Sequence, residues 1–322
     1  RSLIVTGVQT CALPIFNAIG YELIAMTELF QHHRPDIVLL LGDRGETFAA
    51  AIAAAHLNIH IVHIHGGERS GTIDESVRHC ISRLAHYHCA ATLQSKERLI
   101  KMGEKAEHIT VTGAPGLDGL DTFRYITKLE LFEELKLDPN KSTGMVLFHP
   151  VVQEAENMGF QFESILKPLI DLNDWQFVVL APNADTGGGQ ILAIINKFRE
   201  AKNFKIIQHL HRDHYLSLMK TCDVMIGNSS SGIIEAASFN LPVINIGSRQ
   251  NLREQSDNII NVDFSSEHQE LDMVGLIQES LDRFDNKHIK NVYGDGTASA
   301  KILDYVKTIS LDKNILKKVN EY

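Results

Sequence analysis

Residues 65–79 decide the fold, and they read His65-Gly66-Gly67-Glu68-Arg69-Ser70-Gly71-Thr72-Ile73-Asp74-Glu75-Ser76-Val77-Arg78-His79. They follow the apolar run 59–64 and precede a helical pattern, which indicates a turn between a strand and a helix. In α/β folds such turns bind ligands, because backbone N–H groups and the helix dipole converge there. Glycines let the backbone approach a ligand closely, and carboxylates can move protons beside it. The stretch therefore predicts a functional turn, because a structural loop does not need so many titratable groups.

A second turn of the same kind follows the apolar run 224–226, and it reads Gly227-Asn228-Ser229-Ser230-Ser231-Gly232-Ile233-Ile234-Glu235. Small hydroxyl residues and a glycine at the start of a helix leave backbone N–H groups free to bind a phosphate. Serine is also a good helix N-cap, but three serines in a row exceed what a cap needs. The stretch therefore predicts a phosphate-binding turn.

Composition limits the classes of protein that the chain can belong to. It has 322 residues, enough for two domains, and 44% of them are hydrophobic and 22% charged, as in a globular protein. The net charge of −9 and the lack of a basic stripe argue against nucleic-acid binding. No apolar run reaches the ~20 residues of a membrane span. The four cysteines have no paired or metal-binding spacing, which fits reduced thiols in a cytoplasmic protein.

The first residues look foreign to the rest of the chain. Residues 5–15 resemble the in-frame translation of a sequencing adaptor, and we expect the natural sequence to start near Phe16. Residues 1–15 are therefore treated as an artefact and left out of the fold prediction. The alternative is a genuine first strand, because Leu3, Ile4 and Val5 favour β structure.

From Phe16 the chain alternates helices and strands, which predicts two doubly wound α/β domains. We expect a first doubly wound domain over 16–143, a second over 144–296, and a C-terminal helix and tail over 297–322 that packs on the first domain. The break at residues 113–116 and the restart after Gly144 suggest this boundary. Each polar cluster follows a predicted strand, and ligands in such sheets bind at the carboxyl ends of strands. Two such domains facing each other predict one cleft between them.

Charged residues of the first domain suggest proton transfer. Asp43 follows a buried strand, where it can be a general base with Arg44 beside it, or simply a helix N-cap with a surface arginine. Asp74 and Glu75 open the next helix, and two carboxylates there make a proton-handling role credible. Arg78 lies one turn later on the same helix face and can hold a carboxylate or a phosphate.

Histidines and arginines leave further alternatives open. At a period of two, His63 and His65 share a face of their strand, and with Asp43 or Glu68 they could bind a metal, although no further ligands occur at metal spacing. His149 at a strand end is either a ligand-facing or a packed polar residue. Two arginines four residues apart suit a diphosphate, or they lie on a solvated helix face; these are Arg249 and Arg253.

Seven motifs in order make the chain resemble the UDP-N-acetylglucosamine 2-epimerases. The resemblance is greatest to the hydrolysing branch, which forms N-acetylmannosamine for sialic-acid-type sugars, and the strings around Asp43 and Asp74 favour that branch. The motifs lie at residues 42–44, 63–68, 70–79, 148–151, 227–232, 242–250 and 293–296. The resemblance implies two Rossmann-like domains of the glycosyltransferase-B type, with UDP held mainly by the second.

The resemblance also implies roles for single residues. Asp43 and Asp74 match the catalytic carboxylates of the family, and His149 would face the diphosphate or the sugar. A third acidic residue of some members is replaced by His65, so His65 or Glu68 could fill that role. The serines would bind phosphate and Glu235 the ribose. The residues expected to bind substrate are Arg44, Arg78, Asn183, Asn228, Ser229, Ser230, Ser231, Gly232, Glu235, Arg249 and Arg253.

The implied reaction needs no metal and no redox cofactor. A base removes the proton from C2 of the sugar while UDP leaves C1, and the resulting 2-acetamidoglucal then adds water with inversion at C2. Two acid–base groups on opposite faces of the sugar suit this chemistry. The resemblance further implies a homodimer or homotetramer that binds a UDP-sugar.

One departure from the family is large. Members begin with another β-α segment, and here the adaptor-like string stands in its place. We expect the chain as written to be unstable or inactive, because a missing central strand leaves strand edges unpaired.

Four alternatives to the preferred function stay open. They are a non-hydrolysing UDP-GlcNAc 2-epimerase, a hydrolysing epimerase of a UDP-diacetamido sugar, a non-catalytic nucleotide-sugar-binding module, and a metal hydrolase that uses His63 and His65.

Overall fold

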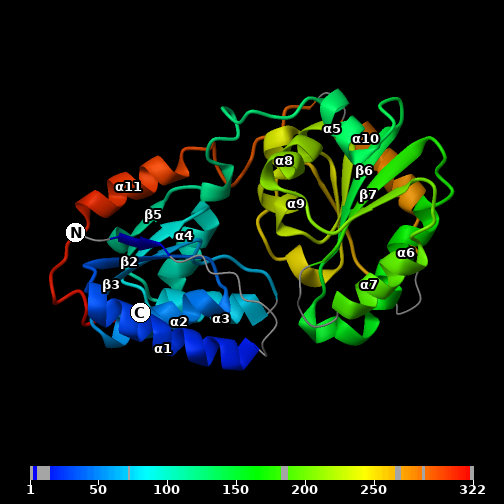
Figure 1. Ribbon diagram of the computed structural model, residues 1–322. Coiled ribbons are helices and arrows are strands. Elements are labelled where there is room, and N and C mark those ends of the chain that lie inside the picture. The colour runs from blue at the N-terminus through cyan, green and yellow to red at the C-terminus, as the bar shows by residue number, and fades with distance from the viewer. Residues whose placement is uncertain are drawn as a thin grey trace. The chain divides into compact units, whose positions relative to one another are not determined.

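The computed structural model describes residues 3–5, 15–71, 73–182, 188–264, 270–284 and 287–319. The chain divides into two compact units, unit 1 with residues 1–119 and 293–322 and unit 2 with residues 120–292 (Figure 1). Each unit contains one parallel β-sheet with helices packed against it. The predicted α/β fold with two Rossmann-like parallel sheets is therefore confirmed.

Unit 1 is built on a five-stranded sheet in the order β1-β2-β3-β4-β5. Its strands are β1 (Leu3–Val5), β2 (Ile37–Leu41), β3 (His60–Ile64), β4 (Tyr87–Ala90) and β5 (Ile109–Val111). The connecting helices are α1 (Ile15–His33), α2 (Gly45–His56), α3 (Ile73–Leu84) and α4 (Leu93–Lys101). Leu41 pairs with Ile64 in the register of β2 and β3, so the turns that follow these two strands begin at the same edge of the sheet.

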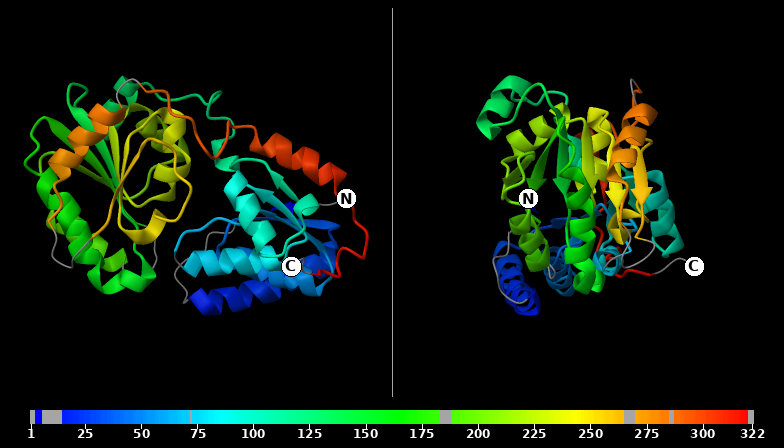
Figure 2. Two further views of the ribbon diagram at one scale, coloured as in Figure 1. Left: turned by 180° about the vertical axis from the view of Figure 1, so that it is seen from behind. Right: turned by 90° about the vertical axis from the view of Figure 1, so that its right-hand side faces the viewer.

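The two faces of this sheet are covered by different parts of the chain. Because successive side chains of a strand point to opposite faces, Leu40 and Ile61 pack with α1, α2 and α3. Leu39 and Val62 face the other way and pack with Ile302 of α11 (Ala298–Thr308) and with the residues that follow it. Figure 2 shows α11 on one side of the sheet and α1 on the other. The C-terminal segment thus completes the core of unit 1.

Unit 2 contains a six-stranded sheet in the order β11-β10-β9-β6-β7-β8. The strands are β6 (Ser142–Leu147), β7 (Trp175–Leu180), β8 (Phe204–Ile207), β9 (Val224–Gly227), β10 (Val243–Ile246) and β11 (Ile259–Val262). Its helices include α5 (Lys128–Leu135), α6 (Met158–Leu169), α7 (Gly188–Lys197), α8 (Arg212–Thr221), α9 (Ser230–Ile234) and α10 (Met273–Phe284). The strand order reverses between β6 and β9, and ligands of doubly wound folds bind at such a point.

The boundary between the units lies at Gly119, whereas the sequence placed it near Gly144. The helix α5 belongs to unit 2, because Ile126 N donates to Ser217 Oγ of α8 at 2.9 Å. The side chain of Gln176 also accepts from Asp138 N at 2.9 Å and donates to Asp138 O at 2.7 Å. The break at residues 113–116 is not a linker but a packed corner of unit 1.

Glycine is required at that corner, where Ala114 N donates to Tyr293 O at 2.8 Å. A Cβ at Gly113, whose φ is +86°, would lie 2.9 Å from the same carbonyl oxygen. This contact also explains why residues 293–296, assigned by the sequence to the second domain, belong to unit 1.

The adaptor-like string lies mostly outside the described residues, which omit 6–14. Leu3–Val5, which end at the first residue of the string, form β1 and pair in parallel with β2, Leu3 with Ile37 and Val5 with Leu39. The strand β2 is therefore paired on both sides. Within the part of the chain that the structure describes, no helix is long and apolar enough to cross a membrane.

Candidate active site

The turns after β2 and β3 meet in an ion pair between Asp43 and Arg78. Arg78 lies on α3 with only 1% of its surface exposed, and its Nη2 donates to Asp43 Oδ2. Its Nη1 donates to Glu68 O at 3.0 Å and lies 3.5 Å from Ser70 Oγ. A buried guanidinium is tolerated only when its donors are paired, so these contacts fix the position of the carboxylate. The structure thus gives Arg78, expected to bind substrate, a partner inside the protein.

Asp43 is not the N-cap of α2. Arg44 occupies that position, its side chain makes no capping hydrogen bond, and its Nε lies 3.7 Å from Glu46 Oε1. The Arg44 side chain is 60% exposed. The interpretation of Asp43 as a helix cap is therefore wrong, while Arg44 stays available to a ligand.

His65 and Glu68, the two candidates for the third proton-transfer group, form one pair. His65 Nδ1 lies 3.0 Å from Glu68 Oε1, and only 13% and 4% of these side chains are exposed. His65 has a φ of +67°, a left-handed conformation that is uncommon for a residue with a side chain, and its N–H donates to Cys89 O. Glu68 also meets Arg78 through its carbonyl oxygen, so the pair adjoins the Asp43 ion pair.

The carboxylates Asp74 and Glu75 both lie in the first turn of α3, as expected. Glu75 Oε2 accepts from Ser70 N and Gly71 N, both at 2.7 Å. Burial would raise the pKa of Glu75, but these two hydrogen bonds and the charges of His79 and Arg69 together outweigh it and lower the pKa below its usual value. Glu75 therefore holds the turn together, and Asp74, half-buried beside it, is the better candidate for proton transfer.

His63 is a buried support of the site. Its Nε2 lies 2.8 Å from Gly42 O, which can only accept, so Nε2 carries the proton and Nδ1 accepts from Ser82 Oγ at 2.9 Å. Burial lowers the pKa of His63 to about 3, which keeps the ring neutral. Both ring nitrogens are thus occupied.

The structure does not favour the metal-binding alternative for His63 and His65. His65 lies beyond the end of β3 in a left-handed conformation, so the two-residue period that would place both side chains on one face does not reach it. Among the described residues, no group of three or more histidine, cysteine or acidic side chains could hold a metal ion.

The glycines of the turn have a structural cause that the sequence did not reveal. A Cβ at Gly66 would lie 2.8 Å from Ser82 Oγ of α3, and a Cβ at Gly67 would overlap Ser95 O of α4. Gly67 O also accepts from Arg98 Nε at 2.6 Å. The two glycines therefore let the turn pack against the helices, whereas the sequence attributed them to the approach of a ligand.

Asn228 organises the turn of unit 2. Its Oδ1 accepts from His149 N at 2.6 Å, and its Nδ2 donates to His149 O at 2.8 Å. Its own carbonyl oxygen accepts from Arg249 Nη1 at 3.0 Å and from Gln250 Nε2 at 3.1 Å. The buried Asn228 side chain, expected to bind substrate, therefore positions His149. The sequence gave Gln250 no role.

The ends of three strands come together around Asn228. Leu147, Gly227 and Asn245 pair across β6, β9 and β10, so the turns after these strands start side by side. Gly227 has a φ of +135°, and a Cβ there would overlap Leu147 O. Only glycine allows this approach of β9 to β6, which brings Asn228 to His149.

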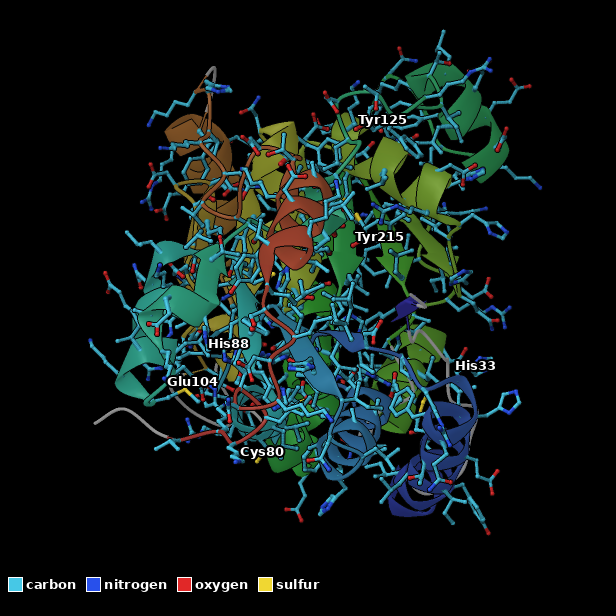
Figure 3. The ribbon with its side chains drawn as sticks, turned by 90° about the vertical axis from the view of Figure 1, so that its left-hand side faces the viewer. His33, Cys80, His88, Glu104, Tyr125 and Tyr215 are labelled. Atoms are coloured by element: carbon cyan, nitrogen blue, oxygen red, sulfur yellow. The ribbon has the colours of Figure 1, made fainter. Side chains whose placement is uncertain are left out.

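The serines of the turn form a hydroxyl chain. Ser229 is the N-cap of α9, and its Oγ lies 3.4 Å from Ser231 N and 2.9 Å from Ser231 Oγ. Ser231 Oγ also contacts the hydroxyl of Tyr215 on α8, and burial raises the pKa of that phenol. Ser230 is the first residue of α9. Tyr215 is labelled in Figure 3. Its contact with Ser231 was not predicted, because a helical sequence pattern does not indicate which group a tyrosine hydroxyl contacts.

Glu235 directly follows α9, and its charge acts on the Tyr215 phenol of this hydroxyl chain. Its Oε1 is 3.9 Å from Arg212 Nη1, and its side chain is 16% exposed. Burial raises the pKa of Glu235 to about 7, while Arg212 opposes the shift. The group therefore changes its charge near neutral pH, a property that the sequence did not indicate.

The remaining residues predicted to bind substrate are Gly232, Arg253 and Asn183. Gly232 packs against β10, since a Cβ there would lie 3.0 Å from Val243 Cγ1. Arg253 N donates to Gln250 O at 3.1 Å, which places it in the turn that holds Arg249. Asn183 lies outside the described residues.

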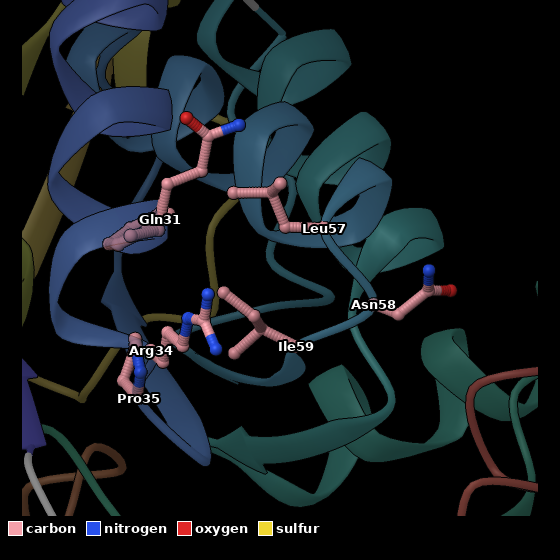
Figure 4. A pocket seen from close by; sticks show the side chains of 7 residues that line it. Gln31, Arg34, Pro35, Leu57, Asn58 and Ile59 are labelled. Atoms are coloured by element: carbon pink, nitrogen blue, oxygen red, sulfur yellow. The ribbon is translucent and has the colours of Figure 1, made fainter.

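A pocket of about 600 Å³ lies away from all these residues (Figure 4). It lies where α1 and α2 end and where β2 and β3 begin, so it is at the opposite strand ends from Asp43 and His65. Its lining consists of Phe30, Gln31, Arg34, Pro35, Leu57, Asn58 and Ile59. It contains none of the candidate residues.

Comparison with known proteins adds independent evidence. The family described as UDP-N-acetylglucosamine 2-epimerase matches residues 15–307. A UDP-N,N'-diacetylbacillosamine 2-epimerase (hydrolyzing) of Legionella pneumophila is 50% identical over 306 residues, which are 95% of this chain and 80% of that protein. A UDP-N-acetylglucosamine 2-epimerase of Neisseria meningitidis is 35% identical over 79% of this chain and 67% of that protein.

Solved structures show the same fold. The UDP-GlcNAc 2-epimerase of Neisseria meningitidis, bound to UDP-GlcNAc, matches with a TM-score of 0.75 and 20% identity over 94% of this chain and 84% of that chain. A putative UDP-N-acetylglucosamine 2-epimerase of Listeria monocytogenes matches with a TM-score of 0.72 and 21% identity, over 92% of this chain and 79% of that chain. The expected glycosyltransferase-B type of fold is confirmed.

Proposed function

The chain belongs to the UDP-N-acetylglucosamine 2-epimerase family, and on that premise we propose that it is a hydrolysing 2-epimerase. It converts a UDP-activated 2-acetamido sugar and water into UDP and the free sugar with inverted configuration at C2. The observation that carries the proposal is the buried Arg78 that holds Asp43 beside His65 and Glu68. An acid–base site of this kind suits proton removal from carbon.

The first candidate substrate is a UDP-2,4-diacetamido sugar such as UDP-N,N'-diacetylbacillosamine. It is favoured by the Legionella pneumophila relative, which is 50% identical and bears that substrate and the hydrolysing reaction in its name. UDP-GlcNAc, with N-acetylmannosamine for sialic-acid-type sugars as the product, is the second candidate. It is supported by the 35% identical relative from Neisseria meningitidis. Both substrates carry the acetamido group at C2.

The reaction proceeds through elimination and hydration. A carboxylate, Asp43 or Asp74, takes the proton from C2 while the bond between C1 and the UDP oxygen breaks, which leaves a C1–C2 double bond. The oxygen of water then bonds to C1 as one of its O–H bonds breaks and a carboxylate takes that proton, and a proton is delivered to C2 on the opposite face. We assign the third proton-transfer role to His65, whose Nδ1 lies 3.0 Å from Glu68 Oε1.

The nucleotide is held by the turn of unit 2. Ser229, Ser230 and Ser231 offer hydroxyl and backbone N–H donors to the diphosphate, and Arg249 adds a positive charge. His149, fixed through its backbone by Asn228, donates to the same group. Donors aimed at the diphosphate stabilise the charge that builds up on it as it leaves C1. Glu235 accepts hydrogen bonds from the ribose hydroxyls.

The test is an incubation of the purified protein with UDP-N,N'-diacetylbacillosamine and, separately, with UDP-GlcNAc in deuterium oxide, followed by NMR. We expect free UDP and a free C2-epimeric sugar that carries deuterium at C2, with the diacetamido substrate turned over faster. A product that keeps its UDP would show a non-hydrolysing epimerase. Binding of UDP without turnover of either compound would replace the proposal with a nucleotide-sugar-binding module.

A further inference from the structure

The segment after α11 runs along unit 1 and is anchored at several points. Ile309 and Ile315 pack with Val62 on the face of the sheet that α11 covers. The hydroxyl of Tyr87 donates to Ser310 O at 2.6 Å, and His60 Nε2 lies 3.3 Å from Asp312 O. Residues 309–319, which we call the strap, are therefore held at the amino ends of β3 and β4. In Figure 1 the strap is the red segment that follows α11.

Near its end the strap carries Lys318, whose side chain is 20% exposed. Lys318 Nζ contacts three acceptors, which are Glu104 Oε2 at 2.6 Å, Ser82 O at 3.0 Å and Ala85 O at 2.6 Å. An ammonium group has three donors, so all of them are used. Burial lowers the pKa of Lys318 to about 8, while Glu104 opposes the shift, and the charged form prevails at pH 7.

Glu104 connects the lysine to the body of unit 1. It is 4% exposed, its Oε2 lies 3.0 Å from His88 Nε2, and its Oε1 accepts from Arg83 of α3. Figure 3 shows His88 and Glu104 next to each other. A buried carboxylate with three partners is a rigid support, because removal of one partner leaves charge unpaired.

The contacts of Lys318 lead to the candidate active site. Ser82 and Ala85 supply carbonyls at the C-terminal end of α3, where a cation is favoured by the helix dipole. Ser82 Oγ donates to His63 Nδ1 at 2.9 Å, and His63 Nε2 donates to Gly42 O at 2.8 Å. Gly42 directly precedes Asp43, and α3 itself carries Arg78, the partner of Asp43.

We propose that Lys318 is a positioning residue for the reaction, which holds the end of α3 and, through Ser82 and His63, the backbone before Asp43. The strap begins on the face of the sheet that α11 covers and ends on the opposite face, where α3 packs. Lys318 therefore holds α3, which lies on the other side of the sheet from α11. The inference rests on the proposed function, because it assigns Lys318 to the same reaction.

The experiment compares Lys318→Met with Lys317→Met at pH 7, on whichever UDP-sugar the unchanged protein hydrolyses. Lys317 is the exposed neighbour, so its variant controls for the loss of a positive charge in the strap. We expect kcat of Lys318→Met to fall about tenfold, as for a modest displacement of reacting groups, with KM and the Kd for UDP unchanged. Lys318→Arg, which keeps the charge and the donors, should recover most of the lost kcat.

A further variant tests the route through Ser82. Ser82→Ala removes the hydroxyl that contacts His63 and keeps the carbonyl that contacts Lys318. If both residues act through one chain of contacts, the double variant should lose less kcat than the product of the two single losses. Losses that multiply would overturn the route through His63.

Two results would overturn the role of Lys318 itself. One is an unchanged kcat in Lys318→Met, and the other is a loss of kcat that matches an equal loss of natively folded protein in thermal unfolding. A second readout, the ¹⁵N NMR signals of His63 in histidine-labelled protein, should change in Lys318→Met and not in Lys317→Met. If the unchanged protein hydrolyses neither UDP-sugar, the proposed function fails, and the His63 signals alone decide whether Lys318 positions this turn.

Discussion

The strand-to-helix turns of the two units occupy equivalent places in their sheets but are held together by different chemistry. The turn of unit 1 depends on ionisable pairs, Arg78 with Asp43 and His65 with Glu68. The turn of unit 2 depends on neutral groups, the Asn228 amide and the hydroxyls of Ser229, Ser231 and Tyr215, and on Arg249, which donates to Asn228 O. A site that moves protons needs groups that titrate, whereas a site that binds a diphosphate needs donors and little negative charge.

The comparison predicts that substitutions in unit 1 change turnover and leave UDP binding intact. Asp43→Asn keeps the shape of the side chain and removes the base, so kcat should fall by about 10³-fold, within the range for loss of general acid–base catalysis. The Kd for UDP, measured by calorimetry, should stay within twofold. Asp36→Asn is the matched control, since Asp36 is an exposed carboxylate just before β2. A kcat near that of the unchanged protein would remove Asp43 from the mechanism.

Substitutions in unit 2 should do the reverse. Asn228→Ala removes two hydrogen bonds to the His149 backbone, a loss of about 2 kcal/mol, so the Kd for UDP should rise about thirtyfold. Asn196→Ala, at an exposed position of α7 in the same unit, should bind UDP normally. Calorimetry measures both, and unchanged UDP binding by Asn228→Ala would show that the His149 turn does not hold the nucleotide.

Glu235, which follows the turn of unit 2, departs from the neutral character of that turn because it titrates near neutral pH. Its pKa of about 7 is raised by burial, and Arg212 and the Tyr215 phenol are the groups that face it. The carboxylate form, to which we assign the ribose hydroxyls, is present above pH 7 and is lost below it. The Kd for UDP should therefore rise as the pH falls from 8 to 6, by up to about tenfold per unit below 7.

The control for this pH dependence separates the protein from the ligand, whose own phosphate titrates. Glu235→Gln keeps the phosphate contribution and loses that of the carboxyl group, so its pH dependence should be weaker than that of the unchanged protein. Glu279→Gln, on the exposed side of α10, should keep the full dependence. Equal curves for the unchanged protein and Glu235→Gln would separate Glu235 from UDP binding.

The fold, and the strand ends that the functional turns follow, were predictable from local sequence patterns. The apolar runs before Gly42, His65 and Gly227 mark buried parallel strands, and the register places their ends at one edge of each sheet. Sequence patterns do not encode which side chains meet across the chain. Arg78 and Asp43 are 35 residues apart, and Lys318 and Ser82 are 236 apart.

The sequence misplaced the boundary between the units and missed the packing role of Gly66 and Gly67 for the same reason. The corner at Gly113 looks like a linker because its partner, Tyr293, comes 180 residues later. Gly66 and Gly67 look like ligand contacts because α3 and α4, which they touch, lie beyond the local pattern. Long-range packing, which propensity and periodicity do not contain, decides each of these positions.

The smallest predicted effect concerns Tyr215, whose hydroxyl contacts Ser231 of the unit 2 turn. It tests whether this hydroxyl contributes to the binding of UDP. Tyr215→Phe removes only the hydroxyl that contacts Ser231 Oγ, a loss of about 0.7 kcal/mol, so the Kd for UDP should rise about threefold with kcat unchanged. Tyr21→Phe, at an exposed position of α1, should have no effect on either. Ser231 Oγ lies 2.9 Å from Ser229 Oγ, so the contact of Tyr215 with Ser231 fixes the orientation of both serine hydroxyls. A change in kcat without a change in Kd would mean that this chain of hydroxyls serves the chemistry as well as the nucleotide, and the division between a titrating and a neutral turn would no longer hold.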